Sequence, residues 1–248
     1  MIYATWCLSD NFGDKLTPYI IEKLSKQKAI WCPLESTTEK FMVVGSILNW
    51  LSPNTTAWGV GIANLNDRVP MKKVIAVRGQ LSGIVTRLSN IEFKSIYGDP
   101  ALLLPRMYEP KTEKKYKYGI VPHYADVEIV LRNLIPSDVL IINPFDDVEK
   151  FIENINQCEK IFSSSLHGLI VADAYGIPSQ WSEFSYDRIG GDRTKYVDYY
   201  MSLGYDPIIN PLDLREGIDF KKLYKTEANL KELNIDLDKL YTSCPFLS

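Results

Sequence analysis

The sequence lacks the features that mark membrane-spanning and nucleic-acid-binding proteins. No apolar stretch approaches the roughly 20 residues that a transmembrane helix needs. Residues 1–6 have no basic region ahead of an apolar run, so no signal peptide is predicted. The net charge of −3 argues against a broad electrostatic surface for nucleic acid. We therefore expect a cytoplasmic protein with no nucleic-acid partner.

Cysteine and histidine are both scarce. The four cysteines form no CxxC pair and no spacing suited to a zinc site, so we expect reduced thiols and no bound metal. They are Cys7, Cys32, Cys158 and Cys244. The chain has only two histidines, which limits any chemistry based on imidazole to His123 and His167.

What the sequence does contain is an alternation of apolar strand-like runs and amphipathic helical stretches. This order favours an α/β fold with mostly parallel sheets. The length of 248 residues suits two compact halves of about 100 to 130 residues each. The segment 105–117 is polar, charged and contains proline, so we interpret it as a linker. This predicts an N-terminal domain at 1–110 and a C-terminal domain at 111–248. A surface loop within one domain is the alternative.

Hydrophobic periodicity locates the individual elements. Strands are expected at 41–44, 56–60, 74–77, 118–121, 139–142 and 160–163. Helices are expected around 16–24, 81–88 and 148–155, from 126 and from 169 onward, and as two short polar-faced helices in the last thirty residues. Asp146 or Asp147 is the candidate N-cap of the helix at 148–155.

Several polar residues of the first half lie where a strand ends and a helix begins, the edge at which ligands collect in parallel α/β sheets. Asn11 and Asp14 precede a helix, and Asp14 is either an acid/base or hydroxyl-binding residue or a helix cap. Ser46 follows a buried strand and suits either ligand binding or an ordinary turn. Arg78 is either an anion-binding residue or a surface ion-pair residue. Asp99 precedes a proline and is interpreted as a structural cap.

Both histidines lie directly after strands of the second half. His123 follows one strand, and His167 follows a run of three serines at the end of another. Serine hydroxyls and the backbone N–H groups of a helix start suit a phosphate or carboxylate, which makes Ser164 and Ser165 candidate binding residues. His167 is placed to donate to the same anion or to move a proton. A hydrogen-bonded structural role is the alternative for each histidine.

A glycine-containing loop carries three cations, Arg188, Arg193 and Lys195. Gly190 and Gly191 are adjacent, which gives the loop backbone freedom. The loop is therefore either a mobile segment that closes on an anion or a solvated surface turn.

Taken in order, these motifs resemble those of the polysaccharide pyruvyl transferase family. They are Asn11-Phe12-Gly13-Asp14, Gly45-Ser46, Val77-Arg78-Gly79 with Ser82, Gly98-Asp99-Pro100-Ala101, and Ser164-Ser165-Leu166-His167-Gly168 with Gly176-Ile177-Pro178. The resemblance implies two Rossmann-like domains facing a cleft, the GT-B arrangement. It implies phosphoenolpyruvate as donor substrate, with no other cofactor. The implied acceptor is a hexose of a surface polysaccharide or of a lipid-linked oligosaccharide, which would bring the enzyme to the inner face of the membrane.

The resemblance also implies roles for individual residues. Asp14 corresponds to the acidic residue near the acceptor, Arg78 to the anion-binding arginine of the first domain, and His167 to the histidine at the donor. The sequence departs from the family at Ser165, where many members carry arginine. Arg188, Arg193 or Lys195 would then supply the missing charge, or the activity has been lost.

The mechanism expected from these roles uses His167 or His123 as the acid on the methylene carbon of the donor. Asp14 assists the attacking sugar hydroxyl, while Arg78 and the loop cations hold the donor. Two other functions stay open at this level, because fold does not determine function. One is a glycosyltransferase that uses a nucleotide sugar, and the other is a non-catalytic carbohydrate-binding protein.

Overall fold

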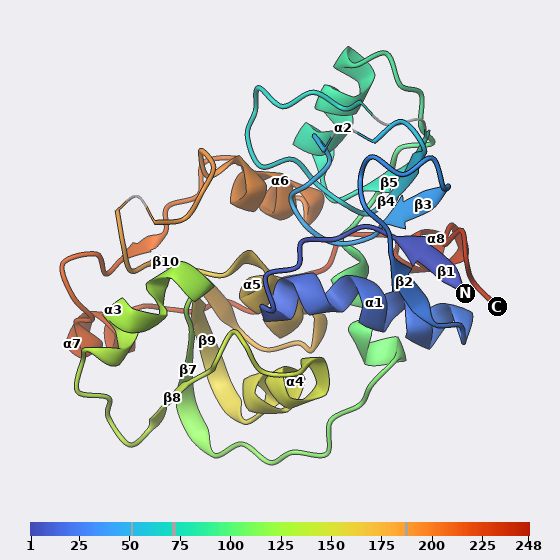
Figure 1. Cartoon of the computed structure of the whole chain (residues 1–248). Coiled ribbons are helices and arrows are strands. Elements are labelled where there is room, and N and C mark those ends of the chain that lie inside the picture. The colour runs from blue at the N-terminus through green and yellow to red at the C-terminus, as the bar shows by residue number, and fades with distance from the viewer. Residues whose placement is uncertain (51, 71–72, 187) are drawn as a thin grey trace. The chain divides into compact units, whose positions relative to one another are not determined.

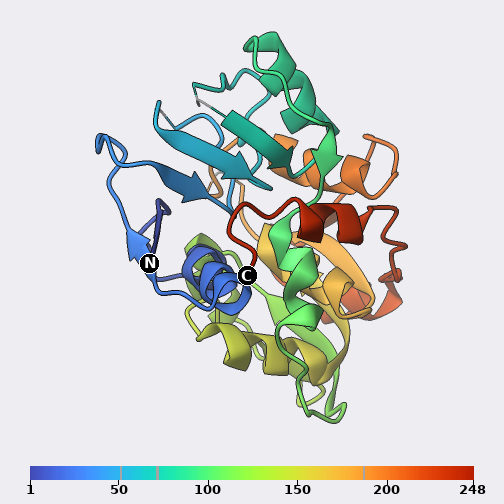
Figure 2. The same cartoon turned by 90° about the vertical axis from the view of Figure 1, so that its right-hand side faces the viewer.

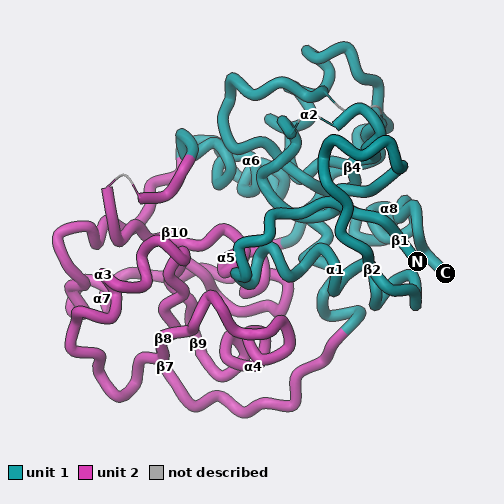
Figure 3. The backbone as a smooth tube through the Cα atoms, viewed as in Figure 1, with its two compact units in different colours: residues 1–107, 191–208, 233–248 teal, residues 108–190, 209–232 magenta. Residues whose placement is uncertain are grey.

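The computed structural model describes residues 1–50, 52–70, 73–186 and 188–248 (Figure 1). These residues divide into two compact units, each with its own parallel sheet (Figure 3). Unit 1 comprises residues 1–107, 191–208 and 233–248, and unit 2 comprises residues 108–190 and 209–232. The α/β class with parallel sheets is confirmed.

The chain crosses from one unit to the other more often than the sequence suggested. The first crossing, between residues 107 and 108, lies within the expected linker at 105–117. The expected C-terminal domain of 111–248 is interrupted twice, because 191–208 and 233–248 belong to unit 1. The physical reason is that both segments supply polar partners to buried groups of unit 1. For example, the indole Nε1 of Trp58 donates to Ser243 Oγ at 3.0 Å.

The described part of unit 1 has a six-stranded parallel sheet in the order β2-β1-β3-β4-β5-β6. The strands are β1 (Ile2–Ala4), β2 (Ala29–Trp31), β3 (Lys40–Met42), β4 (Thr55–Trp58), β5 (Lys73–Val77) and β6 (Ile96–Tyr97). In this doubly wound order the connections leave in opposite directions from the neighbouring strands β1 and β3. The switch point of unit 1 therefore lies at the carboxyl ends of these two strands.

The helices of unit 1 come from three separate stretches of the chain. They are α1 (Phe12–Ser25), α2 (Gln80–Leu88), the 3-10 helix η1 (Pro100–Arg106), α6 (Thr194–Ser202) and α8 (Leu237–Thr242). Helix α8 lies beside η1 (Figure 2), where Arg106 donates to Asp238 at 2.7 Å. Asp99 accepts a hydrogen bond from the backbone N of Ala101 at 3.0 Å, which confirms it as the cap of η1.

Unit 2 repeats the same strand order. Its described sheet has five parallel strands arranged β11-β10-β9-β7-β8. They are β7 (Tyr116–Val121), β8 (Val139–Ile141), β9 (Cys158–Ser163), β10 (Ser179–Glu183) and β11 (Leu212–Asp213). The helices are the 3-10 helix η2 (Tyr124–Asp126), α3 (Val127–Leu131), α4 (Val148–Asn156), α5 (Leu166–Ala174) and α7 (Phe220–Lys225). Here the switch point lies at the carboxyl ends of β7 and β9.

The apolar periodicity that predicted the helices corresponds to buried faces in α1 and α4. In α4 these residues are Val148, Phe151, Ile152 and Ile155, and Asp147 is the N-cap as expected. Helix α2 differs, because Ile84 and Leu88 are 46% and 78% exposed. Its buried residues are Ser82, Gly83, Val85 and Thr86, and the helix packs against α6. No helix of the described chain is long and apolar enough to cross a membrane.

Candidate functional site at the switch points

The two histidines of unit 2 lie at the switch point of its sheet. Strand β7 ends at Val121 and leads to His123, while β9 ends at Ser163 and leads through the serine run into α5. Because Val121 and Ser163 are paired in parallel, the residues after them emerge at the same edge of the sheet. His167 is the second residue of α5. The structure thus brings both histidines and the serines to one edge.

His123 is held in a tight turn by hydrogen bonds at three of its atoms. Its Nδ1 accepts from the backbone N of Ala125 at 3.3 Å, and its carbonyl accepts from the backbone N of Asp126 at 2.8 Å. Its own backbone N donates to Ser164 Oγ at 2.8 Å. The ring lies 4.2 Å from that of Tyr124, centroid to centroid. His123 is therefore the cap of η2 as well as a candidate catalytic group.

The amino end of α5 is shaped to approach the strand ends closely. Ser165 is its N-cap residue, with an extended backbone, and its N donates to Ser163 Oγ at 3.0 Å. A Cβ at Gly168 would lie 2.4 Å from Ser163 Oγ and 2.7 Å from a methyl carbon of Val121. Glycine is required here because any side chain would push the helix away from the sheet. The positive end of the helix dipole is thereby fixed at the switch point.

Asp126 is a site residue that the sequence did not identify, because an aspartate at the start of a helix reads as an ordinary cap. It is fully buried. Its Oδ2 accepts from Ser164 Oγ at 2.6 Å, and its Oδ1 accepts from Ser185 Oγ at 2.5 Å. Since Ser185 follows β10, this one carboxylate links the segments that follow β7, β9 and β10.

At the switch point of unit 1, Asn11 rather than Asp14 caps helix α1. Asn11 Oδ1 accepts from the backbone N of Asp14 at 3.2 Å. The carboxylate of Asp14 accepts from Asn11 Nδ2 at 2.6 Å and from the hydroxyl of Ser9. The interpretation of Asp14 as the N-cap of α1 is therefore wrong. Its role with the acceptor stays a prediction, as does substrate binding by Asn11.

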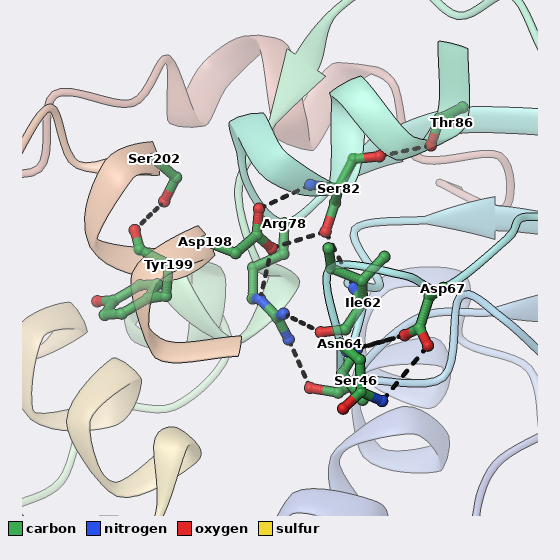
Figure 4. Close-up of polar contacts among 11 residues, drawn as sticks. Ser46, Ile62, Asn64, Asp67, Arg78, Ser82, Thr86, Asp198, Tyr199 and Ser202 are labelled. Carbon is green, nitrogen blue, oxygen red and sulfur yellow. Dashed lines mark hydrogen bonds and ion pairs between the residues drawn. The ribbon is translucent and has the colours of Figure 1, made fainter. Parts of the chain in front are cut away.

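Arg78 lies fully buried inside unit 1, and its guanidinium donates to protein groups on three sides (Figure 4). Nε donates to Asp198 at 3.1 Å, Nη1 to Ser46 Oγ at 2.8 Å, and Nη2 to the carbonyl of Ile62 at 2.7 Å. Asp198, from α6, also accepts from the hydroxyl of Ser82 at 2.6 Å and from its backbone N at 2.9 Å. The cluster therefore joins β5, α2 and α6.

This burial corrects the description of Arg78 as a surface ion-pair residue. The anion that its guanidinium binds in the structure is Asp198, and direct binding of a donor stays a prediction. Ser46, expected to bind substrate, is a hydrogen-bond partner of Arg78. No sequence pattern indicated Asp198, because it lies 120 positions away from its partner.

The three loop cations do not belong to the same unit. Arg188 is in unit 2, where its Nη1 lies 3.5 Å from the carbonyl of Ala125. Arg193 and Lys195 are in unit 1, and Arg193 is the N-cap residue of α6. Asp187, from the same stretch of sequence, lies outside the described residues.

Asp192 fixes the beginning of α6 within unit 1. Its carboxylate accepts from the backbone N of Leu65 at 3.2 Å and from that of Thr194 at 3.1 Å. Partial burial raises the pKa of Asp192, but the hydrogen bonds from Thr194 and Leu65 outweigh this effect and lower it. The carboxylate therefore stays ionised as an anchor. Closure of the loop on an anion stays a prediction.

Within the described ranges, no group of three or more histidine, cysteine, aspartate or glutamate side chains is arranged to hold a metal ion. Metal independence of the chemistry stays a prediction.

Comparison with known proteins places this geometry in a family. A model of the family described as polysaccharide pyruvyl transferase matches residues 57–179. The chain is 32% identical over 217 residues to an uncharacterized protein of Acanthamoeba polyphaga mimivirus, which covers 83% of this chain and 75% of the relative. It is 28% identical over 257 residues to the succinoglycan biosynthesis protein ExoV of Rhizobium meliloti, covering 92% of this chain and 77% of that protein. No solved structure matches.

The segment matched by the family model runs from β4 to the start of β10. It contains Arg78 and the whole switch point of unit 2, with His123, the serine run and His167. The match thus covers Arg78 and the histidines and serines of this switch point, and the chain belongs to the polysaccharide pyruvyl transferase family.

Proposed function

We propose that the protein transfers pyruvate from phosphoenolpyruvate to a hexose and closes it there as a cyclic ketal. The acceptor would be a surface polysaccharide or its lipid-linked precursor. Family membership supports the pyruvyl transfer, and the name of the ExoV relative supports a polysaccharide product. The observation that carries the proposal is the convergence of His123, the serine run and His167 at one switch point.

Donor binding is proposed for unit 2. The donor carries a phosphate and a carboxylate, with a total charge of about −3 near neutral pH. Ser164 and Ser165 lie beside the amino end of α5, where helix N–H groups and the dipole attract anions. A helix dipole supplies only about half a positive charge. Full cations are therefore needed as well. Arg188, Arg193 or Lys195 is the proposed source in place of the arginine that Ser165 replaces, and of these Arg188 belongs to unit 2.

The proposed reaction begins with proton transfer to the methylene carbon of the donor, which becomes the methyl group of the ketal. Positive charge then develops at C2, and one sugar hydroxyl attacks there. The bond from C2 to the phosphate oxygen breaks, and a second sugar hydroxyl adds to C2. One hydroxyl proton replaces the proton that the acid gave, and the other leaves with phosphate. A histidine acting as the acid would contribute about 10² to 10⁴-fold.

Unit 1 is proposed to bind the acceptor, with Asp14 as the group that assists the sugar hydroxyl. Its position at the switch point, where Ser9 and Asn11 orient the carboxylate, supports this role. We propose that the two units are the Rossmann-like domains of a GT-B-like enzyme. We also propose that the reaction needs neither a metal nor a cofactor, and that a lipid-linked acceptor brings the enzyme to the membrane.

The test combines ligand binding with product detection. Phosphoenolpyruvate and a panel of nucleotide sugars are compared by thermal shift, where a ligand at 100 times its Kd stabilises by about 2.7 kcal/mol. Phosphate release and ketal formation are then followed with hexose-containing glycans, with and without a chelator. His167→Ala is expected to keep the fold and lose turnover, while Glu128→Gln serves as a folded control with an exposed carboxylate removed.

Each experimental result distinguishes the proposed function from one alternative. Stabilisation by phosphoenolpyruvate with chelator-resistant phosphate release supports the proposal. Stabilisation by a nucleotide sugar alone would favour a glycosyltransferase, and binding without phosphate release would favour a carbohydrate-binding protein. Loss of activity in chelator that a divalent ion restores would exclude the metal-free mechanism. Near-normal turnover of His167→Ala would assign this histidine a structural role.

A further inference from the structure

The hydrogen bonds around Asp126 connect its buried carboxylate to the backbone of a neighbouring histidine. A carboxylate has no proton to give, so both serine hydroxyls that contact it must donate. The hydroxyl of Ser164 donates its single proton in a hydrogen bond to Asp126 Oδ2 at 2.6 Å. Its lone pairs are then directed to other groups, and the backbone N of His123 donates to them at 2.8 Å. The hydrogen bonds thus converge on the buried carboxylate, directly from Ser185 and, by way of Ser164, from the backbone N of His123.

The same turn fixes the imidazole. The backbone N of Asp126 donates to the carbonyl of His123 at 2.8 Å, which closes the turn. Inside it, the backbone N of Ala125 donates to His123 Nδ1 at 3.3 Å. A ring nitrogen that accepts a hydrogen bond carries no proton, so this contact favours the tautomer with its ring proton on Nε2. Protonation of Nδ1 would set an N–H against the N–H of Ala125.

We infer that Asp126 is a positioning residue that, through Ser164 and the shared turn, holds His123 as a neutral imidazole that donates from Nε2. This inference rests on the proposed function for its catalytic meaning. A neutral Nε2–H is a hydrogen-bond donor for the phosphate or carboxylate of the donor substrate and a poor acid for its methylene carbon. His167 is then the acid, and His123 binds the donor's negative charge.

The tautomer is measurable without any substrate. Because the chain has only two histidines, a ¹⁵N spectrum of the imidazole nitrogens contains two sets of signals, and a His167→Asn sample assigns them. Near neutral pH, His123 is expected to show an unprotonated Nδ1 and a protonated Nε2. Asp126→Asn should disturb this pattern. The side-chain amide of asparagine presents N–H groups to the hydroxyl of Ser164 or Ser185, and that hydroxyl can then no longer donate to it. Glu128→Gln, two residues further on, should leave it unchanged.

Kinetics then test the role. His123→Gln places an uncharged N–H near the position of Nε2 but cannot act as an acid. It is expected to keep kcat/KM within about tenfold of the parent, whereas His123→Ala loses about a hundredfold. Asp126→Asn is expected to raise KM for phosphoenolpyruvate about tenfold with a smaller effect on kcat.

The outcomes separate this inference from the proposed function. A protonated Nδ1 or an imidazolium at His123 near pH 7 would overturn the inference, whatever the substrate is. So would equal losses in His123→Gln and His123→Ala, because these would make the titrating proton essential. If phosphoenolpyruvate is not a substrate but the spectra show the Nε2 tautomer and its dependence on Asp126, the positioning stands and the proposed function fails. If Asp126→Asn does not fold, the inference is tested by the ¹⁵N spectrum of the parent protein and by the kinetics of His123→Gln and His123→Ala.

Discussion

Arg78 and Asp198 form an ion pair at 3.1 Å in which neither side chain is exposed to solvent. The two residues lie 120 positions apart, and the chain between them contains residues 108–190, the larger segment of unit 2. Because an unpaired buried charge is costly, this pair favours the return of the chain to unit 1 at α6. The neighbouring Ser46 and Ser82 satisfy further donors and acceptors of the pair.

Removing either partner of this pair should strongly destabilise unit 1. Arg78→Ala or Asp198→Ala leaves the other charge buried and uncompensated, which costs about 3–5 kcal/mol. Urea denaturation of each variant measures the loss. Arg132→Ala is the matched control, because its pair with Glu128 is exposed and should contribute almost nothing. The double variant Arg78→Met with Asp198→Leu should recover only part of the loss, because Ser82 and the carbonyl of Ile62 then lose hydrogen-bond partners. Normal stability of Arg78→Ala would contradict the importance of the pair.

Gly79 should not tolerate a side chain, because α6 packs directly on its backbone. A Cβ there would lie 1.9 Å from the carbonyl oxygen of Asp198, and backbone cannot move aside as a flexible side chain can. Gly79→Ala is expected to lower the free energy of unfolding by about 1–3 kcal/mol. In Gly190→Ala the added carbon meets no atom within 4 Å, so this control should unfold as the parent does. Equal stability of both variants would show that α6 repacks freely.

At least one loop cation should contribute to donor binding. Removing Arg188, Arg193 or Lys195 singly by alanine is expected to raise the Kd of phosphoenolpyruvate at least tenfold in one case, about 1.4 kcal/mol. Arginine suits the donor because its planar group binds carboxylate or phosphate through two N–H groups. Calorimetric titration gives the constants, with Lys225→Ala as the control for loss of an exposed cation.

Arg78→Ala is predicted to raise the same constant at least tenfold, about 1.4 kcal/mol, provided that the folded fraction is measured in the same sample. If all four variants bind phosphoenolpyruvate as the parent does, the donor model is wrong. The nucleotide-sugar and carbohydrate-binding functions would then gain support.

Asp14→Asn should lower kcat more than it weakens donor binding, because its proposed partner is the acceptor hydroxyl. Asn11, and not Asp14, caps α1, so the change should cost little stability. Steady-state kinetics with separate titration of the donor distinguishes the two effects. Asp219→Asn is a comparable change at the cap of α7 and should leave turnover intact. A loss of about 1 kcal/mol in stability with normal turnover would show that Asp14 serves only α1.

Alkaline pH should destabilise the protein through its buried thiols. Burial raises the pKa of Cys158 from 9.0 to about 12, although the nearby Lys114 opposes this shift. Between these values the unfolded chain releases a proton that the folded chain keeps, so the free energy of unfolding falls as pH rises, by up to about 1.4 kcal/mol per unit. Cys158→Ala should reduce this slope. Cys244→Ala should reduce it over a narrower range, because burial raises the pKa of Cys244 only to about 11. An unchanged slope in Cys158→Ala would refute this assignment.

The local pattern of the chain determined the elements and their order. Apolar residues at helical or strand spacing predicted α1, α4, β5 and β7 because burial of an apolar face stabilises each element wherever it packs. Strand–helix alternation predicted parallel sheets, and with them the edge at which polar residues gather. That reasoning identified His123, Ser164 and His167 as neighbours of one sheet edge, which the structure confirms.

Only the tertiary structure decided which polar groups meet. Asp198 and Asp126 look like ordinary helix residues in the sequence, because hydrogen-bond partners 120 and 38 positions away leave no periodic trace nearby. Burial of Arg78, burial of Ser82 in α2 and the return of the last segment to unit 1 all depend on such contacts. The free energy of apolar burial is roughly proportional to the area buried, so a local apolar pattern is enough to predict an element. The pairing of buried polar groups is directional and depends on residues that only the folded structure brings together.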